Sequence, residues 1–218
     1  MVHKPNAGHR GKSKPRNKRF LIYSGGIVTE VEYFQYVRRH LFGDYVKNLR
    51  IKSGEVDDPV RVEADGVDPK TLVEGAAKLL REDKKDAKKE SYDPFAVVWA
   101  VTDVDDFGKN GDKLRAAVDK GRQSGVEVII SNPCFDVWLI DMSRNRNNPK
   151  HIRQEAIVEQ YATAAKNAQK HMSEQHRRIR DNRPSSGDYA PWTDIPKIVD
   201  TLIEEYKTLI NKGEEETL

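Results

Sequence analysis

The segment PFAVVWAVTDVDDFG, which begins at Pro94, limits the possible folds of this 218-residue chain more than any other stretch. Every residue from Phe95 to Val101 is apolar, and the acids Asp103, Asp105 and Asp106 follow soon after it. A strand with one face in water alternates apolar and polar side chains, whereas a strand buried on both faces is apolar throughout. We therefore expect Phe95–Val101 to lie in the middle of a parallel sheet that helices cover on both sides.

The rest of the chain supplies neighbours for this strand. A first helix begins at a capping box, with Thr29 as N-cap and Glu32 at N3, and Gly43 ends it. The turn-rich segment 53–69 receives no element. Alternating strands and helices predict an open, mainly parallel α/β sheet flanked by helices, with a C-terminal helical extension and ligands at the carboxyl ends of the strands. The remaining predicted elements are strands at Phe20–Tyr23, Leu49–Lys52 and Val126–Ile130 and helices at Lys70–Lys89, Asp112–Ser124, Ile152–Arg180 and Pro196–Asn211.

The charge of the chain is unevenly distributed. Residues 1–19 hold seven of the 38 Lys and Arg residues and no acid, which leaves 31 basic and 35 acidic residues beyond them. Because this Gly-, Pro- and Asn-rich stretch cannot form a core, we expect a disordered basic tail at 1–19, an α/β domain at 20–145 and a helical region at 146–218 that packs on it. Basic arms bind phosphate backbones, but they also bind membranes and acidic proteins weakly, and a merely solubilising extension is the alternative.

Cysteine usage and hydropathy indicate the compartment. The single cysteine, Cys134, excludes an internal disulfide and fits a reducing environment. No apolar run approaches the roughly 20 residues of a membrane span, and the N-terminus lacks the apolar core of a secretory signal. We expect a cytoplasmic protein without a membrane partner.

The acids that follow the apolar strand are the strongest functional signal. Residues two apart in an extended segment point to the same side, so Asp103 and Asp105 are placed to share one Mg²⁺ ion. Two adjacent carboxylates repel each other unless a cation neutralises them. The alternative is a polar strand exit in which Asp106 begins a turn into Phe107 and Gly108.

A second candidate, SNPCFDVW at Ser131–Trp138, follows another predicted buried strand. Asp136 approaches Asp103 if the two strand ends are neighbours. The alternative is a helix start that Asn132 caps, with Phe135 and Trp138 in the core, and we favour core packing for these two aromatic residues.

The first strand runs into the turn Ser24-Gly25-Gly26, then Thr29-Glu30 and Tyr33-Phe34. Together with VWAVTDVD and ISNPCFDVWL, this pattern resembles the RloB-like abortive-infection family over about residues 20–140. That family is assigned a Toprim-type fold, the α/β metal-binding domain also seen in topoisomerases, primases and OLD-family nucleases. The resemblance implies a Toprim-like domain whose Asp103 and Asp105 form the DxD pair that binds Mg²⁺ (or Mn²⁺).

The resemblance also assigns the remaining acids. Asp136 stands where the family usually has a glutamate, and Glu30 matches the glutamate ahead of the first helix. Gly25 replaces the first glutamate of the family's motif, a metal ligand or general base in Toprim enzymes, and Ile27 and Val28 replace a further acid and a lysine. Glycine cannot take a proton or coordinate a metal through a side chain, and losing a positioned general base typically lowers the rate about 10²–10⁴-fold.

Two functions remain open from the sequence. The first is a metal-dependent nuclease of antiphage defence that acts on RNA or DNA, with catalytic residues Glu30, Asp103, Asp105 and Asp136 and with Asp103, Asp105 and Asp136 on the metal. The second is a catalytically degenerate Toprim-like protein that binds nucleic acid or a partner ATPase, which the resemblance implies, without cleaving. The sequence leaves the oligomeric state open. The expected contacts to nucleic acid are Lys14, Arg16, Lys18, Arg19, Arg177, Arg178 and Arg180. For the last three, the alternative that we slightly favour is a solvated helix face.

Overall fold

A computed structural model describes residues 18–53, 58–90, 92–104, 112–132, 134–139 and 192–215. Its strands form one five-stranded sheet in the order β2-β1-β3-β4-β5, parallel except for the last pair. The strands are β1 (Arg19–Ser24), β2 (Val60–Ala64), β3 (Phe95–Asp103), β4 (Glu127–Asn132) and β5 (Trp192–Thr193). The helices are α1 (Thr29–Ser53), α2 (Pro69–Glu90), α3 (Asp112–Ser124) and α6 (Ile195–Glu215).

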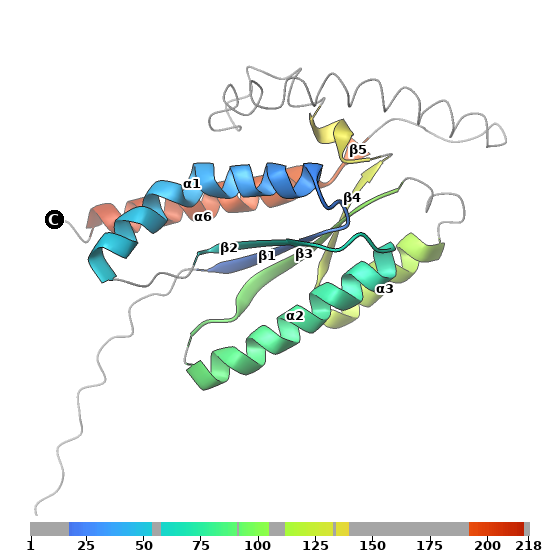
Figure 1. The fold of residues 1–218 in the computed structure, drawn as a ribbon, viewed down its shortest axis with the longest axis horizontal. Helices are drawn as coiled ribbons and strands as arrows, with labels where there is room; N and C mark the ends of the chain where they lie inside the picture. Colours follow the sequence, from blue (N-terminus) through green and yellow to red (C-terminus); the bar gives the residue numbers. More distant parts are fainter. Residues whose placement is uncertain are drawn as a thin grey trace, which may run out of the picture.

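The apolar strand occupies the predicted central position. β3 is hydrogen-bonded to β1 on one side and to β4 on the other, both in parallel. Helices α1 and α6 cover one face of the sheet, and α2 and α3 cover the other (Figure 1). The side chains of Trp99 and Val101 enter the core under α1 and α6, whereas Val98 and Ala100 enter the core over α2 and α3. Two covered faces explain why this strand is apolar throughout, and the predicted fold class is confirmed.

The first helix differs from the prediction. α1 continues through Gly43 to Ser53, so neither the helix end at Gly43 nor the strand at Leu49–Lys52 is correct. A glycine inside a helix costs only about 1 kcal/mol relative to alanine. Burial of the neighbouring Phe42, whose ring lies 6.0 Å from that of Tyr206 on α6, exceeds this cost.

The second strand lies in the segment that the sequence left unassigned. Val60–Ala64 pairs with β1 along its whole length, from Phe20 with Val60 to Ser24 with Ala64. It is an edge strand in which only Val60 is fully buried, so its sequence lacks the apolar run that identifies β3. Its assignment depends on the ladder with β1 rather than on local pattern.

The start of α1 does not form the hydrogen bond that the predicted capping box requires. The Glu32 amide, which the capping box assigns to the Thr29 hydroxyl, donates to the Val28 carbonyl at 2.9 Å. At α2 the cap is Asp68, whose carboxylate accepts hydrogen bonds from the Lys70 amide and the Thr71 hydroxyl at 3.1 and 2.6 Å. These bonds, that from the hydroxyl first, lower the pKa of Asp68 below its ordinary value.

The C-terminal part of the chain completes both the sheet and the core. β5 pairs antiparallel with the end of β4, which the sequence did not predict, and α6 packs its apolar side beside α1. Within the described ranges, no helix is both long and apolar enough to cross a membrane. The predicted helix at Ile152–Arg180 lies outside the described residues.

Candidate functional site

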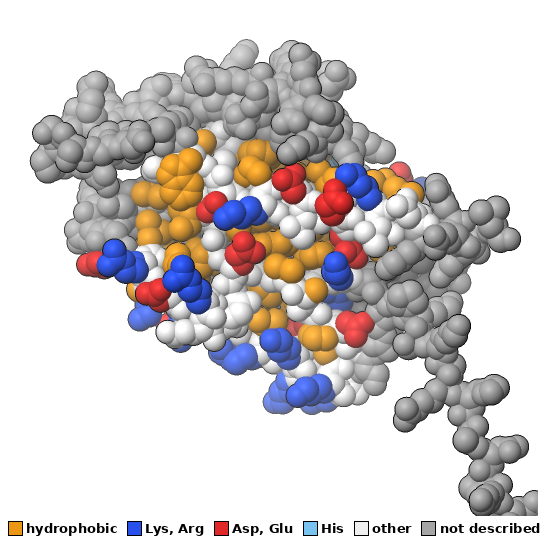
Figure 2. All heavy atoms as spheres, turned by 180° about the vertical axis from the view of Figure 1, so that it is seen from behind, with side chains coloured by type: hydrophobic (Ala, Val, Ile, Leu, Met, Phe, Trp, Pro, Cys, Tyr) orange, Lys and Arg blue, Asp and Glu red, His pale blue; other side chains and the backbone are white. Residues whose placement is uncertain are grey.

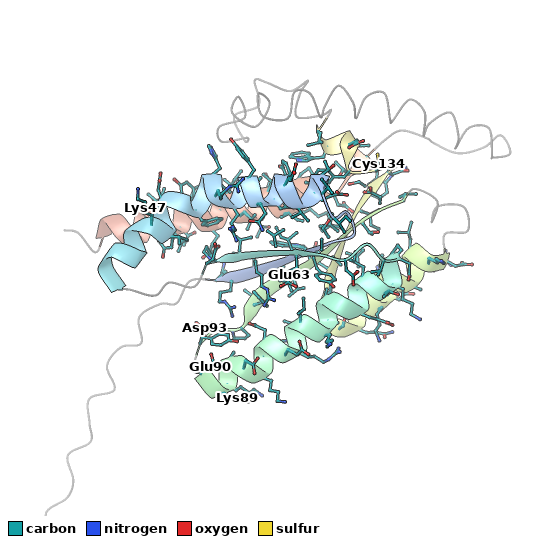
Figure 3. All side chains as sticks on the ribbon, viewed as in Figure 1. Lys47, Glu63, Lys89, Glu90, Asp93 and Cys134 are labelled. Atoms are coloured by element: carbon teal, nitrogen blue, oxygen red, sulfur yellow. The ribbon has the colours of Figure 1, made fainter. Side chains whose placement is uncertain are left out.

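The carboxyl ends of β1, β3 and β4 meet at one edge of the sheet, which we call the carboxyl edge. Ser24 at the end of β1 pairs with Val101, and Asp103 at the end of β3 pairs with Ser131 near the end of β4. Cys134, just after β4, lies at this edge, while Lys89, Glu90 and Asp93 lie at the opposite end of the sheet (Figure 3). Residues that follow these three strands are therefore neighbours in space.

The glycine turn after β1 is fixed against β3. The Gly25 amide donates to the Val101 carbonyl at 2.8 Å, and the Gly26 amide donates to the Ser24 hydroxyl at 3.2 Å. The turn thus lies two residues before Asp103 along the neighbouring strand. A Cβ added at Gly25 would lie 3.3 Å from the Val101 carbonyl oxygen and 3.5 Å from Leu72 Cδ2.

Glu30 folds back over this turn. A Cβ added at Gly26 would lie 1.9 Å from both Cδ and Oε2 of Glu30, so the carboxylate fills the space that any larger residue at position 26 needs. Only glycine leaves room for it. The structure therefore brings the Glu30 carboxylate to the same turn in which Gly25 lacks an acidic side chain.

Asp103 ends β3 on the α1 side of the sheet. The alternation along the strand gives Asp103 the same face as Trp99 and Val101, and its Oδ1 atom is fully buried. Asp105 and Asp106 lie outside the described residues, so their expected roles stay predictions.

Asp136 lies in a half-buried position in the helical turn that follows β4. Its neighbours Phe135 and Trp138 are buried, and their rings lie 5.4 and 6.4 Å from that of Tyr33 on α1, which confirms their predicted place in the core. The predicted cap is wrong, because Asn132 pairs with Trp192 of β5 while the Cys134 carbonyl accepts the Val137 amide at 3.1 Å.

Three helices begin at the carboxyl edge, because α1, α2 and α3 each follow a parallel strand. The amide groups at a helix N-terminus carry a partial positive charge that favours anions such as phosphate.

Among the described residues, no three His, Cys, Asp or Glu side chains form a group able to hold a metal ion. The donors that follow the strands are carboxylates, the ligand type that Mg²⁺ prefers.

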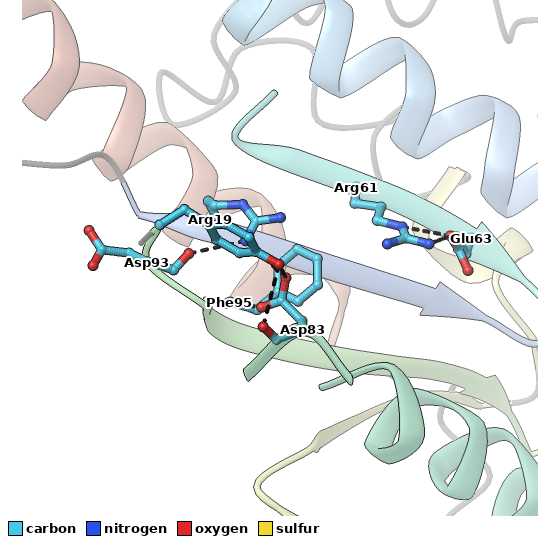
Figure 4. A network of polar contacts seen from close by, with 7 residues as sticks. Arg19, Arg61, Glu63, Asp83, Asp93 and Phe95 are labelled. Atoms are coloured by element: carbon cyan, nitrogen blue, oxygen red, sulfur yellow. Dashed lines mark hydrogen bonds and ion pairs between the residues drawn. The ribbon is translucent and has the colours of Figure 1, made fainter. Parts of the chain in front are cut away.

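The basic residues at the start of the folded region lie at the other end of the sheet. Arg19, expected in a disordered tail, is the first residue of β1 and pairs with Asp83 at 2.9 Å (Figure 4). Its guanidinium also lies 4.7 and 4.5 Å from the ring centroids of Tyr92 and Phe95. Arg19 thus contributes to the fold, and its expected contact with nucleic acid stays a prediction.

The other expected nucleic-acid contacts give less information. Lys18 forms an ion pair at 3.3 Å with Glu205 of α6. On the face seen from behind, acidic and basic side chains are interspersed, with hydrophobic side chains between them (Figure 2). The remaining expected contacts, Lys14, Arg16, Arg177, Arg178 and Arg180, lie outside the described residues.

The fold and this edge define an α/β protein with acidic side chains at the carboxyl ends of a mainly parallel sheet. A model of the RloB-like protein family matches residues 20–202, which is most of the chain. The chain belongs to the RloB-like family. Searches of curated proteins and of solved structures found no match.

Proposed function

We propose that this protein is a metal-dependent phosphodiester hydrolase of the Toprim type that cleaves RNA or DNA in prokaryotic antiphage defence. One observation carries the proposal: the Glu30 carboxylate folds over Gly26, at the turn that is hydrogen-bonded to β3 just before Asp103. Glu30 would thereby supply the acid that Gly25 cannot. The helix N-termini at the same edge would hold the phosphate backbone.

The proposal gives each acid a role. Asp103, with Asp105 and Asp136, would hold Mg²⁺ (or Mn²⁺), and Glu30 would orient or deprotonate the attacking water. Mg²⁺ in such sites usually takes only one or two protein carboxylates and completes its shell with water and substrate phosphate. Carboxylates at the carboxyl edge therefore suit this ion, which would stabilise charge on the phosphate when bound.

The alternative is a catalytically degenerate protein that binds nucleic acid or a partner ATPase without cleaving. Gly25 favours this function, because it has no side chain at the position of the family's first glutamate. The two proposals differ in whether Glu30 replaces that residue. The nuclease and the nucleic-acid-binding form of the alternative both place nucleic acid at the carboxyl edge.

The decisive experiment is cleavage of labelled tRNA and plasmid DNA with Mg²⁺ or Mn²⁺. The nuclease proposal expects wild type to cut, Asp103→Ala to lose cleavage with its fold intact, and Glu30→Gln to lose about 10²–10⁴-fold in rate. The matched control is Asp86→Ala, a half-exposed acid of α2 that pairs with Lys89 at 3.5 Å far from the carboxyl edge, and this variant should keep full activity.

The variant Gly25→Glu separates the two functions. Its Cβ would lie 3.3 Å from the Val101 carbonyl oxygen, which must shift by a few tenths of an ångström to admit it, and a thermal melt checks that the variant folds. If Gly25→Glu cuts and wild type does not, the protein is the degenerate form. Full activity of Asp103→Ala would disprove the assignment of the site.

A further inference from the structure

Exposed hydrophobic side chains gather at the carboxyl edge. Among the described residues, four large hydrophobic side chains are exposed: Ile27 by 64%, Val28 by 59%, Trp192 by 45% and Ile210 by 38%. Ile27 and Val28 lie in the turn between β1 and α1, and Trp192 lies in β5 beside the end of β4. Only Ile210, near the end of α6, lies elsewhere.

The strand register places these residues on both sides of Asp103. Asp103 pairs with Ser131, and the Ser131 hydroxyl lies 2.8 Å from that of its strand partner Thr193, so these residues share the α1 face of the sheet. Trp192, the neighbour of Thr193, therefore lies on the other face, on the side of the N-termini of α2 and α3. Adjacent strands lie about 4.8 Å apart, so β5 is about 10 Å from β3 along the edge. Ile27 and Val28 follow β1, which is the neighbour of β3 on its other side.

The exposure of Trp192 is not required by the fold. The other two tryptophans, Trp99 and Trp138, are each 1% exposed and fill the core under α1 and α6. Trp192 contributes its backbone to the ladder with Asn132 and leaves a large aromatic surface in water. An aromatic ring beside a phosphate-binding edge is the arrangement on which unpaired bases stack.

Such a surface would distinguish single-stranded from double-stranded nucleic acid. Bases within a duplex stack on one another and hide their faces, whereas unpaired bases present their faces to aromatic and apolar side chains. A chain that crosses the carboxyl edge with its phosphates at the helix N-termini would carry one base toward Trp192. It would carry another toward Ile27 and Val28.

We propose that the substrate is single-stranded where it crosses the carboxyl edge, with an unpaired base stacked on Trp192. Ile27 and Val28 contact the chain on the other side of Asp103. This inference rests on the proposed function for the identity of the ligand as nucleic acid. It adds that recognition depends on unpaired bases, which RNA and DNA share.

Trp192 is also a built-in reporter, because the other two tryptophans are buried. The experiment titrates the full-length Asp103→Ala protein with a 12-nucleotide single-stranded RNA, the same sequence as DNA, and the corresponding duplexes. Tryptophan fluorescence reports stacking, and the anisotropy of a labelled strand reports binding independently. We expect saturable quenching by single strands and little by duplexes.

Substitutions at Trp192 make the test specific. Trp192→Ala should weaken single-strand binding about 5- to 150-fold and leave duplex binding unchanged. Trp192→Phe should keep most of the affinity, because phenylalanine still stacks, while the quenching disappears with the indole. Ile210→Ala is the control for loss of an exposed hydrophobic side chain and should change neither signal.

The outcomes separate this inference from the proposed function. Binding by anisotropy without quenching, or equal weakening of single-strand and duplex binding by Trp192→Ala, overturns the stacking inference and leaves the nuclease proposal standing. Quenching with no cleavage by wild type supports stacking and rejects the nuclease. Absence of binding to every nucleic acid tested rejects both. The RNA and DNA series decide which backbone is preferred.

Discussion

At the scale of single residues, the position of Glu30 depends on Gly26. The carboxylate occupies the space of a Cβ at position 26, and the backbone of Gly26 has no positive φ, so an alanine there meets only this steric conflict. Glycine is present at this position for close approach rather than for its conformational freedom. The residue therefore controls where the proposed catalytic acid lies.

The first prediction follows from that contact. Gly26→Ala should displace the Glu30 carboxylate and reduce nuclease activity to about the level of Glu30→Gln, a loss of about 10²–10⁴-fold. Gly43→Ala in α1 is the matched control, since a Cβ there meets nothing within 4 Å and should stabilise the protein by about 0.5–1 kcal/mol. Rates of cleavage and thermal melts of both variants provide the measurement; equal rates for Gly26→Ala and wild type would contradict the role of Glu30.

The helix cap at Asp68 gives a second prediction at this scale. Asp68→Ala should lower the free energy of unfolding by about 1 kcal/mol, because the amide of Lys70 and the hydroxyl of Thr71 lose their acceptor. Asp68→Asn keeps an acceptor and should cost less.

The cap also makes the free energy of unfolding depend on pH. Hydrogen bonds lower the pKa of Asp68 in the folded state below the ordinary 3.8, so the stabilisation by the carboxylate is complete above that pH and disappears as the pH falls through the folded pKa. The stability difference between wild type and Asp68→Asn, measured by urea unfolding, should therefore shrink below about pH 4. A difference that grows toward lower pH would contradict this cap.

At the scale of elements, α3 approaches β4 closely through one glycine. A Cβ added at Gly121 would lie 2.5 Å from the Val126 carbonyl oxygen and 2.9 Å from Val128 Cγ2. The Val126 amide donates to the Gly121 carbonyl at 3.0 Å, so the helix end and the strand start are fixed to each other. The next turn closes at Gly125, whose φ of 75° lies in the left-handed region that favours glycine.

Substitution of that glycine tests the helix–strand contact. Gly121→Ala should lower the free energy of unfolding by about 1–3 kcal/mol, because backbone atoms must move apart to admit the methyl group. Gly43→Ala, whose added Cβ meets nothing within 4 Å, again serves as control, and denaturant unfolding is the measurement. If Gly121→Ala is as stable as wild type, the close approach of α3 to β4 is wrong.

At the scale of the whole molecule, polar contacts close the end of the sheet opposite the carboxyl edge. The Asp83 carboxylate of α2 accepts the Phe95 amide of β3 at 2.7 Å and pairs with Arg19 of β1. Arg19 also donates to the Asp93 carbonyl at 3.0 Å. One charge pair thus connects two strands and a helix that are distant in sequence.

Removing one partner of this pair should destabilise the whole fold. Arg19→Ala leaves Asp83 buried without its counter-charge and should lower the free energy of unfolding by about 3 kcal/mol. The control is Arg61→Ala, because Arg61 pairs with Glu63 on the surface and such pairs contribute about 0–1 kcal/mol. Urea unfolding of the two variants is the measurement. Equal losses of unfolding free energy in Arg19→Ala and Arg61→Ala would show that burial of the Arg19 pair is unimportant.

Strong periodicity and a long apolar run were sufficient to predict much of this fold. The bounds of α3 and the start of β3 were predicted to the residue, and the helix predicted at Lys70–Lys89 differs from α2 by only one residue at each end. Helices and strands of this kind can be predicted from the sequence because each buries a continuous face, which leaves a regular apolar pattern. The prediction failed where burial is partial, as in β2, or where packing overrides a local signal, as at Gly43.

The candidate site divides in the same way. The position of Asp103 at the end of the apolar strand could be predicted from the sequence, because the apolar run that β3 buries on both faces marks where the strand ends. Only the tertiary structure placed the Glu30 carboxylate over Gly26 and set Trp192 in a fifth strand beside β4. Those placements depend on contacts between residues that are close in space through a turn or a ladder. Such contacts leave no periodic trace in the sequence, so local pattern determined the elements and long-range pairing determined what surrounds the site.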